Sequence, residues 1–226
     1  IIDIGGESTR PGSTRVSSQE QIERVVHIIK AINETKPKDV QISIDTTRSA
    51  VAEAALNVGA EIVNDVSAGN DDPEIIQLCV DRKCSYIIMH MQGTPETMQN
   101  NPTYNNVVSE ILFFLETKAE EYIKAGINDD KIIIDPGIGF GKTSVHNFTL
   151  LNNLNIFVSS GYSVLLGASR KRFMGDICNV DTPSELIGAT TATTVLGVHA
   201  GVKIFRVHDV KENRQAADTA WAILNR

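Results

Sequence analysis

Seven short apolar runs, separated by longer segments with helical periodicity, most constrain what this chain can fold into. Each run is rich in Ile and Val and is mostly apolar on both faces, which is typical of a parallel strand buried on two sides. The runs are residues 1–4, 41–45, 61–66, 85–90, 131–135, 163–168 and 202–208. Regular alternation of strand and helix predicts βαβ units and a parallel sheet.

The helical segments between the runs have recognisable starts and stops. Ser17 and Glu20 form a capping-box pattern ahead of a helical spacing of apolar residues. Residues 107–124 predict a long amphipathic helix that ends at Gly126, and residues 212–224 predict a last helix. These signals divide the chain into strand–helix units without a linker or repeat.

The fold class follows from the number of units and from where polar residues fall. Seven strands are visible, and the chain begins at Ile1 as if inside a strand, so one earlier strand would complete a (β/α)8 TIM-type barrel. We therefore expect residues 1–226 to be one α/β domain whose first strand and first βα loop precede Ile1. Polar residues end almost every strand, as at the rim of a barrel, whereas an open doubly wound sheet gathers them at one crevice. They are Asp3, Asp45, Asn64, Asp65, His90, Asp135, Ser169, Arg206 and His208.

Charge and cysteine content narrow the class of protein. A formal charge of −7, from 21 Lys+Arg against 28 Asp+Glu, argues against a nucleic-acid partner. Three cysteines without a C-x-x-C pattern make a poor disulfide framework or zinc site. No apolar run reaches membrane-spanning length and no signal peptide is visible. We expect a chain with no membrane partner, in a reducing compartment: the cytoplasm or an organellar matrix.

Several strand ends offer groups that recognise a flat heterocycle. Asp45 offers a carboxylate and Asn64 an amide that both donates and accepts hydrogen bonds. Residues 135–142, Asp-Pro-Gly-Ile-Gly-Phe-Gly-Lys, fail the Walker A pattern at Pro136 and the dinucleotide fingerprint at Lys142. What remains is a carboxylate followed by glycines that let a ligand approach the backbone. Taken singly, these motifs equally fit helix caps and turns.

Other strand ends offer positive charge. Residues 169–172, Ser-Arg-Lys-Arg, place three cations after a strand, where they repel one another unless an anion or an acidic partner is near. A solvated charge run is the alternative. Arg206 and His208 are two apart on a strand and so face the same way, which suits phosphate. Acids and an amide on some strands, with cations on others, suit a hydrogen-bonding heterocycle joined to an anionic group.

Seven segments, in this order, resemble the motifs of dihydropteroate synthases. They are Asp-Ile-Gly-Gly-Glu-Ser-Thr-Arg-Pro-Gly (3–12), Ser-Ile-Asp-Thr (43–46), Asn-Asp-Val-Ser-Ala (64–68), Met-His-Met-Gln-Gly (89–93), Asp-Pro-Gly-Ile-Gly-Phe-Gly-Lys (135–142), Ser-Arg-Lys (169–171) and Arg-Val-His-Asp-Val (206–210). They span almost the whole chain. The resemblance implies an enzyme that joins 6-hydroxymethyl-7,8-dihydropterin diphosphate to p-aminobenzoate, giving 7,8-dihydropteroate and diphosphate.

The resemblance also implies a role for each matching residue. Asp45, Lys171, Arg206 and His208 would be catalytic. The pterin would be held by Asp45, Asn64, Met89, Asp135, Phe140 and Lys171. The diphosphate would be held by Asn64, Arg206 and His208. Thr9, Arg10, Pro11 and Lys171 would border the p-aminobenzoate pocket, where sulfonamides also bind, with Thr9 and Arg10 on a mobile loop.

The family further implies a Mg²⁺ cofactor and a homodimer. Its metal-binding Asn lies in a loop that would precede Ile1, so we expect no metal ligand in these 226 residues. Many bacterial members also have Ser where this chain has Arg172. Two other functions remain open: a methyltetrahydrofolate–corrinoid methyltransferase, which shares the barrel but binds no diphosphate, and a non-catalytic pterin-binding module.

Overall fold

The computed structural model describes residues 1–8 and 13–226, and in these residues the strands form one parallel sheet. Its order is β1-β2-β3-β4-β5-β6-β7, so each strand pairs with the next along the chain. The strands are β1 (Ile2–Gly5), β2 (Ile42–Asp45), β3 (Ile62–Asp65), β4 (Ser85–Met89), β5 (Ile132–Asp135), β6 (Ser163–Leu166) and β7 (Ile204–Phe205). All seven predicted strands are present, although β7 is much shorter than the predicted 202–208.

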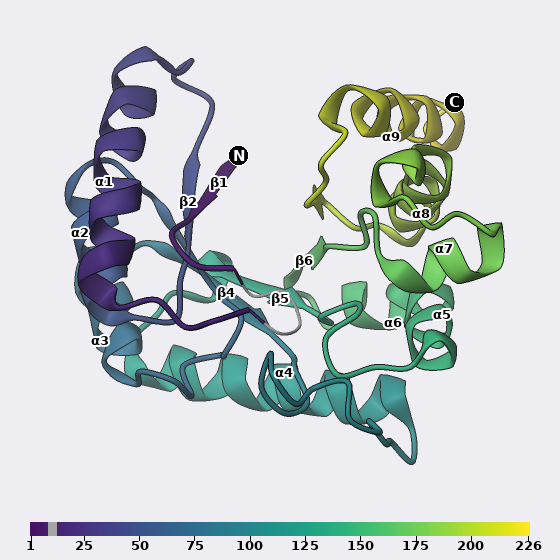
Figure 1. The fold of residues 1–226 in the computed structure, drawn as a ribbon, viewed down its shortest axis with the longest axis horizontal. Coiled ribbons are helices and arrows are strands. Elements are labelled where there is room, and N and C mark those ends of the chain that lie inside the picture. Colours follow the sequence, from purple (N-terminus) through teal and green to yellow (C-terminus); the bar gives the residue numbers. More distant parts are fainter. Residues whose placement is uncertain (9–12) are drawn as a thin grey trace.

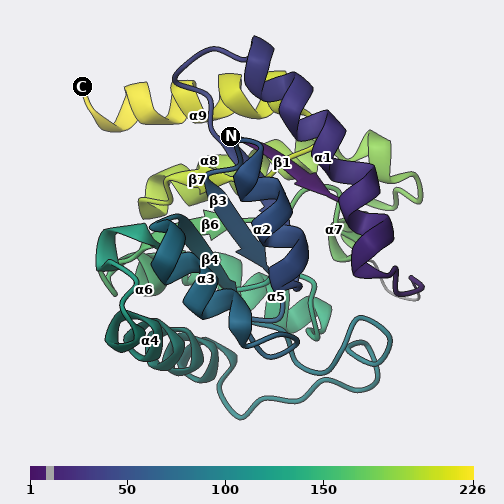
Figure 2. The same cartoon turned by 90° about the vertical axis from the view of Figure 1, so that its left-hand side faces the viewer.

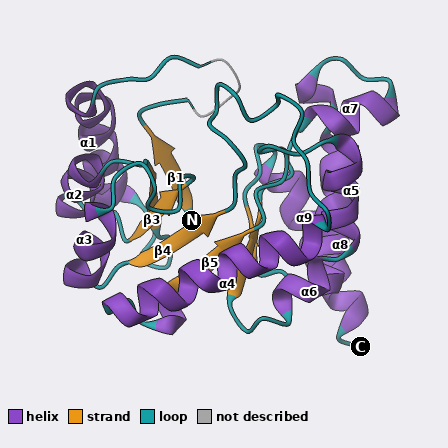
Figure 3. Ribbon diagram, turned by 90° about the horizontal axis from the view of Figure 1, so that it is seen from below, coloured by secondary structure: helices purple, strands orange, loops and turns teal. Residues whose placement is uncertain are grey.

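Helices cover the outside of this sheet. They are α1 (Ser18–Thr35), α2 (Ser49–Asn57), α3 (Glu74–Arg82), α4 (Val107–Ala125), α5 (Ser144–Asn152), α6 (Leu154–Val158), α7 (Arg172–Cys178), α8 (Ile187–Ala200) and α9 (Val210–Leu224). The sheet curls so that α1–α3 flank its first strands and α5–α9 its last (Figure 1). Turned by 90°, α1, α2 and α3 stand in front of the strands (Figure 2). From below, the strands lie between these two groups of helices (Figure 3).

The strand order distinguishes a barrel from a doubly wound sheet. A doubly wound sheet reverses its strand order at a switch point, and no reversal occurs between β1 and β7. The described residues therefore form a curled, incomplete (β/α) barrel with β1 and β7 at its edges, as the predicted fold class requires.

The helix ends follow local sequence signals. Ser17 Oγ accepts the Glu20 N–H at 3.2 Å, which is one half of the predicted capping box, whereas the Glu20 carboxylate pairs with Arg24. Asn106 caps α4, and Gly126, with φ 118°, ends it in the left-handed conformation that glycine adopts without strain. Helix α9 begins at Val210, two residues before the predicted start.

The two faces of the sheet have different chemistry because side chains alternate along each strand. The outer face packs under the helices through residues such as Ile44, Ile88 and Ile134. The inner face carries a small apolar cluster: Ile62, Ile87, Ile133 and Leu165, with Ile204 against it. Two positions further along the same strands stand Asn64, Met89, Asp135, Gly167 and Arg206. The barrel interior thus has an apolar floor and, at the carboxyl ends of the strands, a polar mouth.

Candidate active site at the mouth of the barrel

One polar cluster at this mouth joins the first strands to the last. Arg206, after β7, donates from Nε to Asp3 Oδ2 at 2.6 Å and from Nη2 to Asp45 Oδ2 at 2.9 Å. Asn64, on β3, donates from Nδ2 to the same Asp3 oxygen at 3.3 Å. The register pairs Asp45 with Asn64 on neighbouring strands. Four side chains that are far apart in the sequence therefore meet across the curled sheet.

Burial and like charge shape the electrostatics of this cluster. Burial raises the pKa of Asp45 to about 7, and the nearby Asp3 carboxylate adds to the rise, while Arg206 opposes it. Burial works against the charge on Arg206, but Asp3 and Asp45 outweigh it and raise the pKa of the guanidinium. The cluster is thus a pair of carboxylates held near each other by one cation.

Asp135, at the end of β5, is the second acid of the mouth. Its Oδ1 accepts the Gly137 N–H at 2.7 Å. Burial raises the pKa of Asp135 to about 6, against the Gly137 hydrogen bond and the charges of Lys171, Lys142 and Arg206. Asp135 and Arg206 each stand two residues beyond the inner apolar cluster, at Ile133 and Ile204, so both lie at the same end of the barrel interior.

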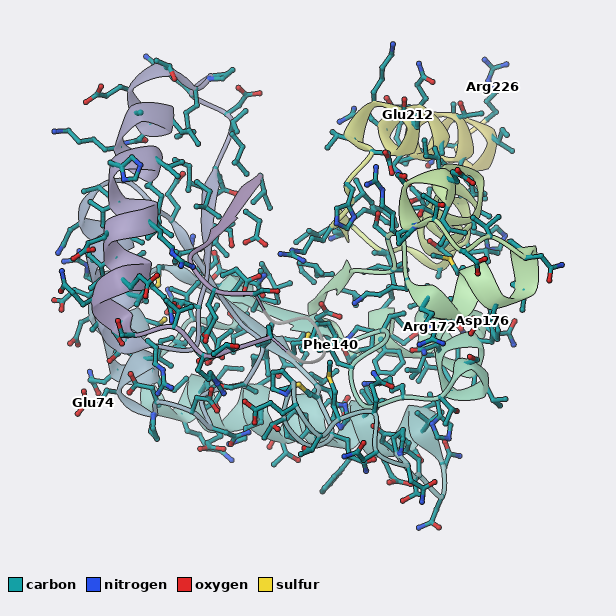
Figure 4. All side chains as sticks on the ribbon, viewed as in Figure 1. Glu74, Phe140, Arg172, Asp176, Glu212 and Arg226 are labelled. Carbon is teal, nitrogen blue, oxygen red and sulfur yellow. The ribbon has the colours of Figure 1, made fainter. Side chains whose placement is uncertain are left out.

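Phe140 and Lys171 form an aromatic–cation pair beside Asp135. Lys171 Nζ lies 4.3 Å from the centroid of the Phe140 ring, a cation–π contact. Phe140 lies between α1–α3 and α5–α9 in the view of Figure 4. Met89 is 3% exposed and pairs with Asp135 in the strand register. A flat ring above Asp135 would thus meet an apolar wall and a cation.

The three cations of residues 170–172 do not act together. Arg170 forms two hydrogen bonds with Asp209, at 3.0 and 2.6 Å, so an acidic partner offsets its charge. Lys171 faces Phe140, and Arg172 is exposed at the start of α7. The first residue of the 169–172 motif, Ser169, contacts His208, with Oγ and Nδ1 3.0 Å apart. The chain thus separates three neighbouring charges into a structural pair, a mouth cation and a surface residue.

Three predicted site residues, Thr9, Arg10 and Pro11, lie outside the described residues. The segments on either side are held by Glu7, which accepts from the Val16 N–H at 2.8 Å and from Gln21 Nε2 at 3.3 Å. Gln21 is buried on α1. Among residues 1–8 and 13–226, no group of three or more His, Cys, Asp or Glu side chains is placed to hold a metal ion.

Two residues of the mouth, Asp3 and Lys142, have contacts that the sequence does not predict. Asp3 ends a predicted strand, but no pattern in the sequence indicates that it contacts Arg206, 203 residues away. The alternation of side chains along β1 could have placed Asp3 on the inner face. The register pairs Asp3 with Ser43, which lies two residues before Asp45 and so on the same face of β2. Lys142 was noted only because it breaks a dinucleotide fingerprint, yet it is 3% exposed and sits among site residues.

Comparison with known proteins identifies the family. The model of the pterin-binding enzyme family matches residues 1–208. A dihydropteroate synthase from Synechocystis is 42% identical over 224 residues, which cover 98% of this chain and 77% of that protein. The chain belongs to the dihydropteroate synthase family. It therefore shares with these relatives an activity in folate synthesis as well as a fold.

Solved structures of dihydropteroate synthases superpose closely on the chain. The Yersinia pestis enzyme in complex with a sulfonamide drug has a TM-score of 0.95 at 36% identity, covering 100% of this chain and 80% of that one. The Xanthomonas albilineans enzyme with 4-aminobenzoic acid has a TM-score of 0.92 at 34% identity, covering 99% and 79%. Dihydropteroate synthase structures thus share the parallel barrel described above.

Proposed function

We propose that this protein condenses 6-hydroxymethyl-7,8-dihydropterin diphosphate with p-aminobenzoate to give 7,8-dihydropteroate and diphosphate. One observation carries the proposal: in a member of this family, Asp135 and Arg206 stand at the same end of the barrel interior, each two residues beyond the inner apolar cluster. A heterocycle held by the acid and a diphosphate held by the guanidinium then belong to one ligand.

The acids, the amide and the aromatic side chain would bind the pterin. The Asp135 carboxylate accepts hydrogen bonds from the donor edge of the ring, since an ionised carboxylate offers two acceptor oxygens and no donor. Asn64 and Asp45 take the remaining polar edges. Met89 and Phe140 cover the ring faces, and Lys171 lies at the ring's outer side. The methylene carbon would then lie on the Arg206 side, because the diphosphate joined to it needs a cation.

The cations would stabilise the departing diphosphate. The methylene C–O bond breaks with its electron pair on the diphosphate, and Arg206, His208 and Asn64 meet that negative charge. The amine nitrogen of p-aminobenzoate then forms the new C–N bond and releases a proton to solvent. No general base is required, because a neutral arylamine is already a nucleophile. Lys171, with Thr9, Arg10 and Pro11, would border the p-aminobenzoate.

The expected Mg²⁺ does not fit the described residues by themselves, since they offer no group of three metal-ligating side chains. The roles proposed for Asp135, Lys171 and Arg206 therefore involve no metal ion. Mg²⁺ stays a proposed cofactor, and no step of the reaction is assigned to it. Turnover in EDTA, with and without added Mg²⁺, tests this expectation.

The decisive experiment measures dihydropteroate formation by the intact protein and by two variants. Lys171→Ala and Arg206→Ala should each lose roughly 2–4 kcal/mol of transition-state stabilisation in kcat/KM. Lys124→Ala and Arg214→Ala, at exposed positions of α4 and α9, are the matched controls and should keep activity. Near-normal activity of both site variants would refute the assignment.

The same preparation separates the two rival functions. If the protein is a corrinoid methyltransferase, titration with cobalamin should produce a change in the cobalamin absorption spectrum. A binding module would hold a pterin ligand without forming product from the two substrates. Product formation that is lost in Arg206→Ala excludes both.

We further propose a homodimer formed through α8 and α9. These two helices pack together and expose large apolar side chains: Val195, Leu196, Trp221, Ile223 and Leu224. Such a patch is typical of a subunit interface. Sedimentation analysis should give twice the chain mass, and Trp221→Lys should shift it toward the monomer. A monomeric wild type at micromolar concentration would contradict the dimer.

We place the activity in the cytoplasm or an organellar matrix. Cys79, Cys84 and Cys178 are all free thiols, which suits a reducing compartment. Within residues 1–8 and 13–226, no helix combines the length and apolar character needed to cross a membrane.

A further inference from the structure

Lys142, in the loop between β5 and α5, has no part in the reaction as derived so far. Its Nζ lies 2.9 Å from the Phe140 carbonyl oxygen, 3.2 Å from the His90 carbonyl oxygen and 3.1 Å from His90 Nδ1. An ammonium group has three N–H donors and no acceptor. These three acceptors therefore match its full donor capacity, and the side chain is buried.

His90 is a neutral acceptor in this arrangement. Burial lowers the pKa of His90 to about 3, and the charge of Lys142 adds to the effect. The ring packs edge-on against Phe114, with centroids 5.0 Å apart. Since an uncharged imidazole has one acceptor nitrogen, the Lys142 contact assigns that role to Nδ1. Below about pH 7, where Lys142 is protonated, the positive charge in this region therefore resides on Lys142.

The contacts of Lys142 join two loops that touch backbone to backbone. Gly137 and Gly141 both have positive φ, 67° and 62°. A Cβ atom at Gly137 would collide with the His90 carbonyl oxygen, and one at Gly141 with the Gln92 carbonyl oxygen. Only glycine permits this close approach at these positions. Lys142 then closes the junction by binding a carbonyl on each loop.

The charge of Lys142 also acts on Asp135, to which it is joined through His90: the His90 N–H donates to the Asp135 carbonyl oxygen at 3.0 Å, and the His90 carbonyl oxygen accepts from Lys142. The charges acting on Asp135 come from Lys171 after β6, Lys142 after β5 and Arg206 after β7. Burial lowers the pKa of Lys142 to about 7; Lys171 adds to the fall and Asp135 opposes it. Asp135 and Lys142 therefore each favour the charged form of the other. Lys171 and Arg206 are proposed to contact substrate, whereas Lys142 uses its N–H donors for hydrogen bonds within the protein.

We propose that Lys142 is a positioning residue for pterin binding: its buried ammonium group locks the loop after β4 to the loop after β5 and keeps Asp135 ionised. A structural role alone would not call for a charge, because burying an ammonium group is costly unless a partner offsets it. The cation matters here because the ring's N–H groups need a carboxylate as acceptor. This inference rests on the proposed function, in which Asp135 holds the pterin.

The test follows pterin binding and turnover of the intact protein from pH 5 to pH 9. Lys142→Met removes charge and donors, Lys142→Gln removes the charge but keeps an amide donor, and Lys142→Arg keeps the charge. Lys124→Met, at an exposed position of α4, is the control. The neutral variants should shift the acid limb of kcat/KM upward by about one pH unit, giving roughly fivefold weaker activity at pH 6, roughly tenfold weaker activity at pH 5 and nearly normal activity at pH 8.5. Lys142→Arg should keep the wild-type limb.

Each outcome decides the inference. An acid limb that stays in place in folded Lys142→Gln, or a loss of equal size at every pH, would overturn it and leave a purely structural lysine. If Lys142→Met does not fold, the comparison of Gln with Arg still gives the answer. A wild type that binds pterin without forming dihydropteroate would refute the proposed reaction, while the binding titration would still test Lys142. A wild type that binds no pterin would refute both.

Discussion

The ends of β3 and β5 present the same residue type in two different conditions. Asp65 is fully buried and accepts four hydrogen bonds: from the Ser67 N–H at 2.8 Å, Ser67 Oγ at 2.7 Å, the Gly69 N–H at 2.8 Å and Tyr86 Oη at 2.7 Å. Asp135 is 7% exposed and accepts one hydrogen bond from the described residues, the Gly137 N–H.

The difference teaches how to tell a structural acid from a ligand-binding one. Burial is the first cause of a raised pKa at both positions. At Asp65, donors from the same loop and from Tyr86 fill the acceptor sites of the carboxylate, so it ties the loop after β3 to the barrel. At Asp135, much of the acceptor capacity remains for a ligand. Saturation by protein donors, more than burial, separates the two.

The largest effect should be the loss of stability when the Asp65 carboxylate is removed. Asp65→Ala leaves two backbone N–H groups and two hydroxyl groups buried without their acceptor, so we expect a loss of roughly 3–5 kcal/mol in the free energy of unfolding. Urea denaturation followed by circular dichroism measures it. A loss below roughly 1 kcal/mol would show that Asp65 is not the anchor of this loop.

The next effect separates stability from activity at Asp135. Asp135→Asn should lower kcat/KM roughly 10²–10³-fold, because the amide cannot accept two hydrogen bonds from the ring's donor edge as a carboxylate does. It should also raise the free energy of unfolding at pH 7.5 by roughly 1–3 kcal/mol, because an ionised carboxylate with a raised pKa is disfavoured in the folded state. If the variant is less stable instead, the contrast with Asp65 fails.

The smallest effect is a pH dependence of pterin affinity, which we expect from the mouth acids Asp135 and Asp45 but not from Asp65. Asp135 has a pKa of about 6, so its contribution to pterin affinity should drop roughly tenfold per pH unit well below pH 6, and Asp45, with a pKa of about 7, should add to the fall from about pH 7 downward. Isothermal titration with a pterin ligand from pH 5 to pH 8 measures this. Stability should not fall in parallel through these groups, since their folded pKa values lie above the unfolded value and protonation favours the folded state. A titration that is flat across this range would contradict the role of Asp135.

Local patterns sufficed for the elements and for the general place of the site. The seven strands, the cap at Ser17 and the stop at Gly126 depend on neighbours within a few residues. The motifs that resemble those of a known family also predict a role for each matching residue, because the family's reaction is known. The roles of Asp45, Asn64, Met89, Asp135, Phe140, Lys171, Arg206 and His208 stay predictions, as do those of Thr9, Arg10 and Pro11.

Other features needed the curl of the sheet. Nothing local shows that Arg206 donates to Asp3 and Asp45, because only the ring brings β7 near β1 and β2. The pairing of Arg170 with Asp209 likewise separates a charge from its neighbours that the sequence presents as one run.

The sequence by itself determined the order of the elements and the side-chain alternation that puts polar residues at the strand ends, because both depend on short-range periodicity. Only the tertiary structure decided which acids are saturated, as Asp65 is, and which stay open, as Asp135 does, because the path of the loop after each strand sets how many of its donors reach the carboxylate, and Tyr86 reaches Asp65 from the neighbouring strand β4. It also decided that Lys142 is buried between two loops, since burial depends on what packs around a residue and not on the residue itself.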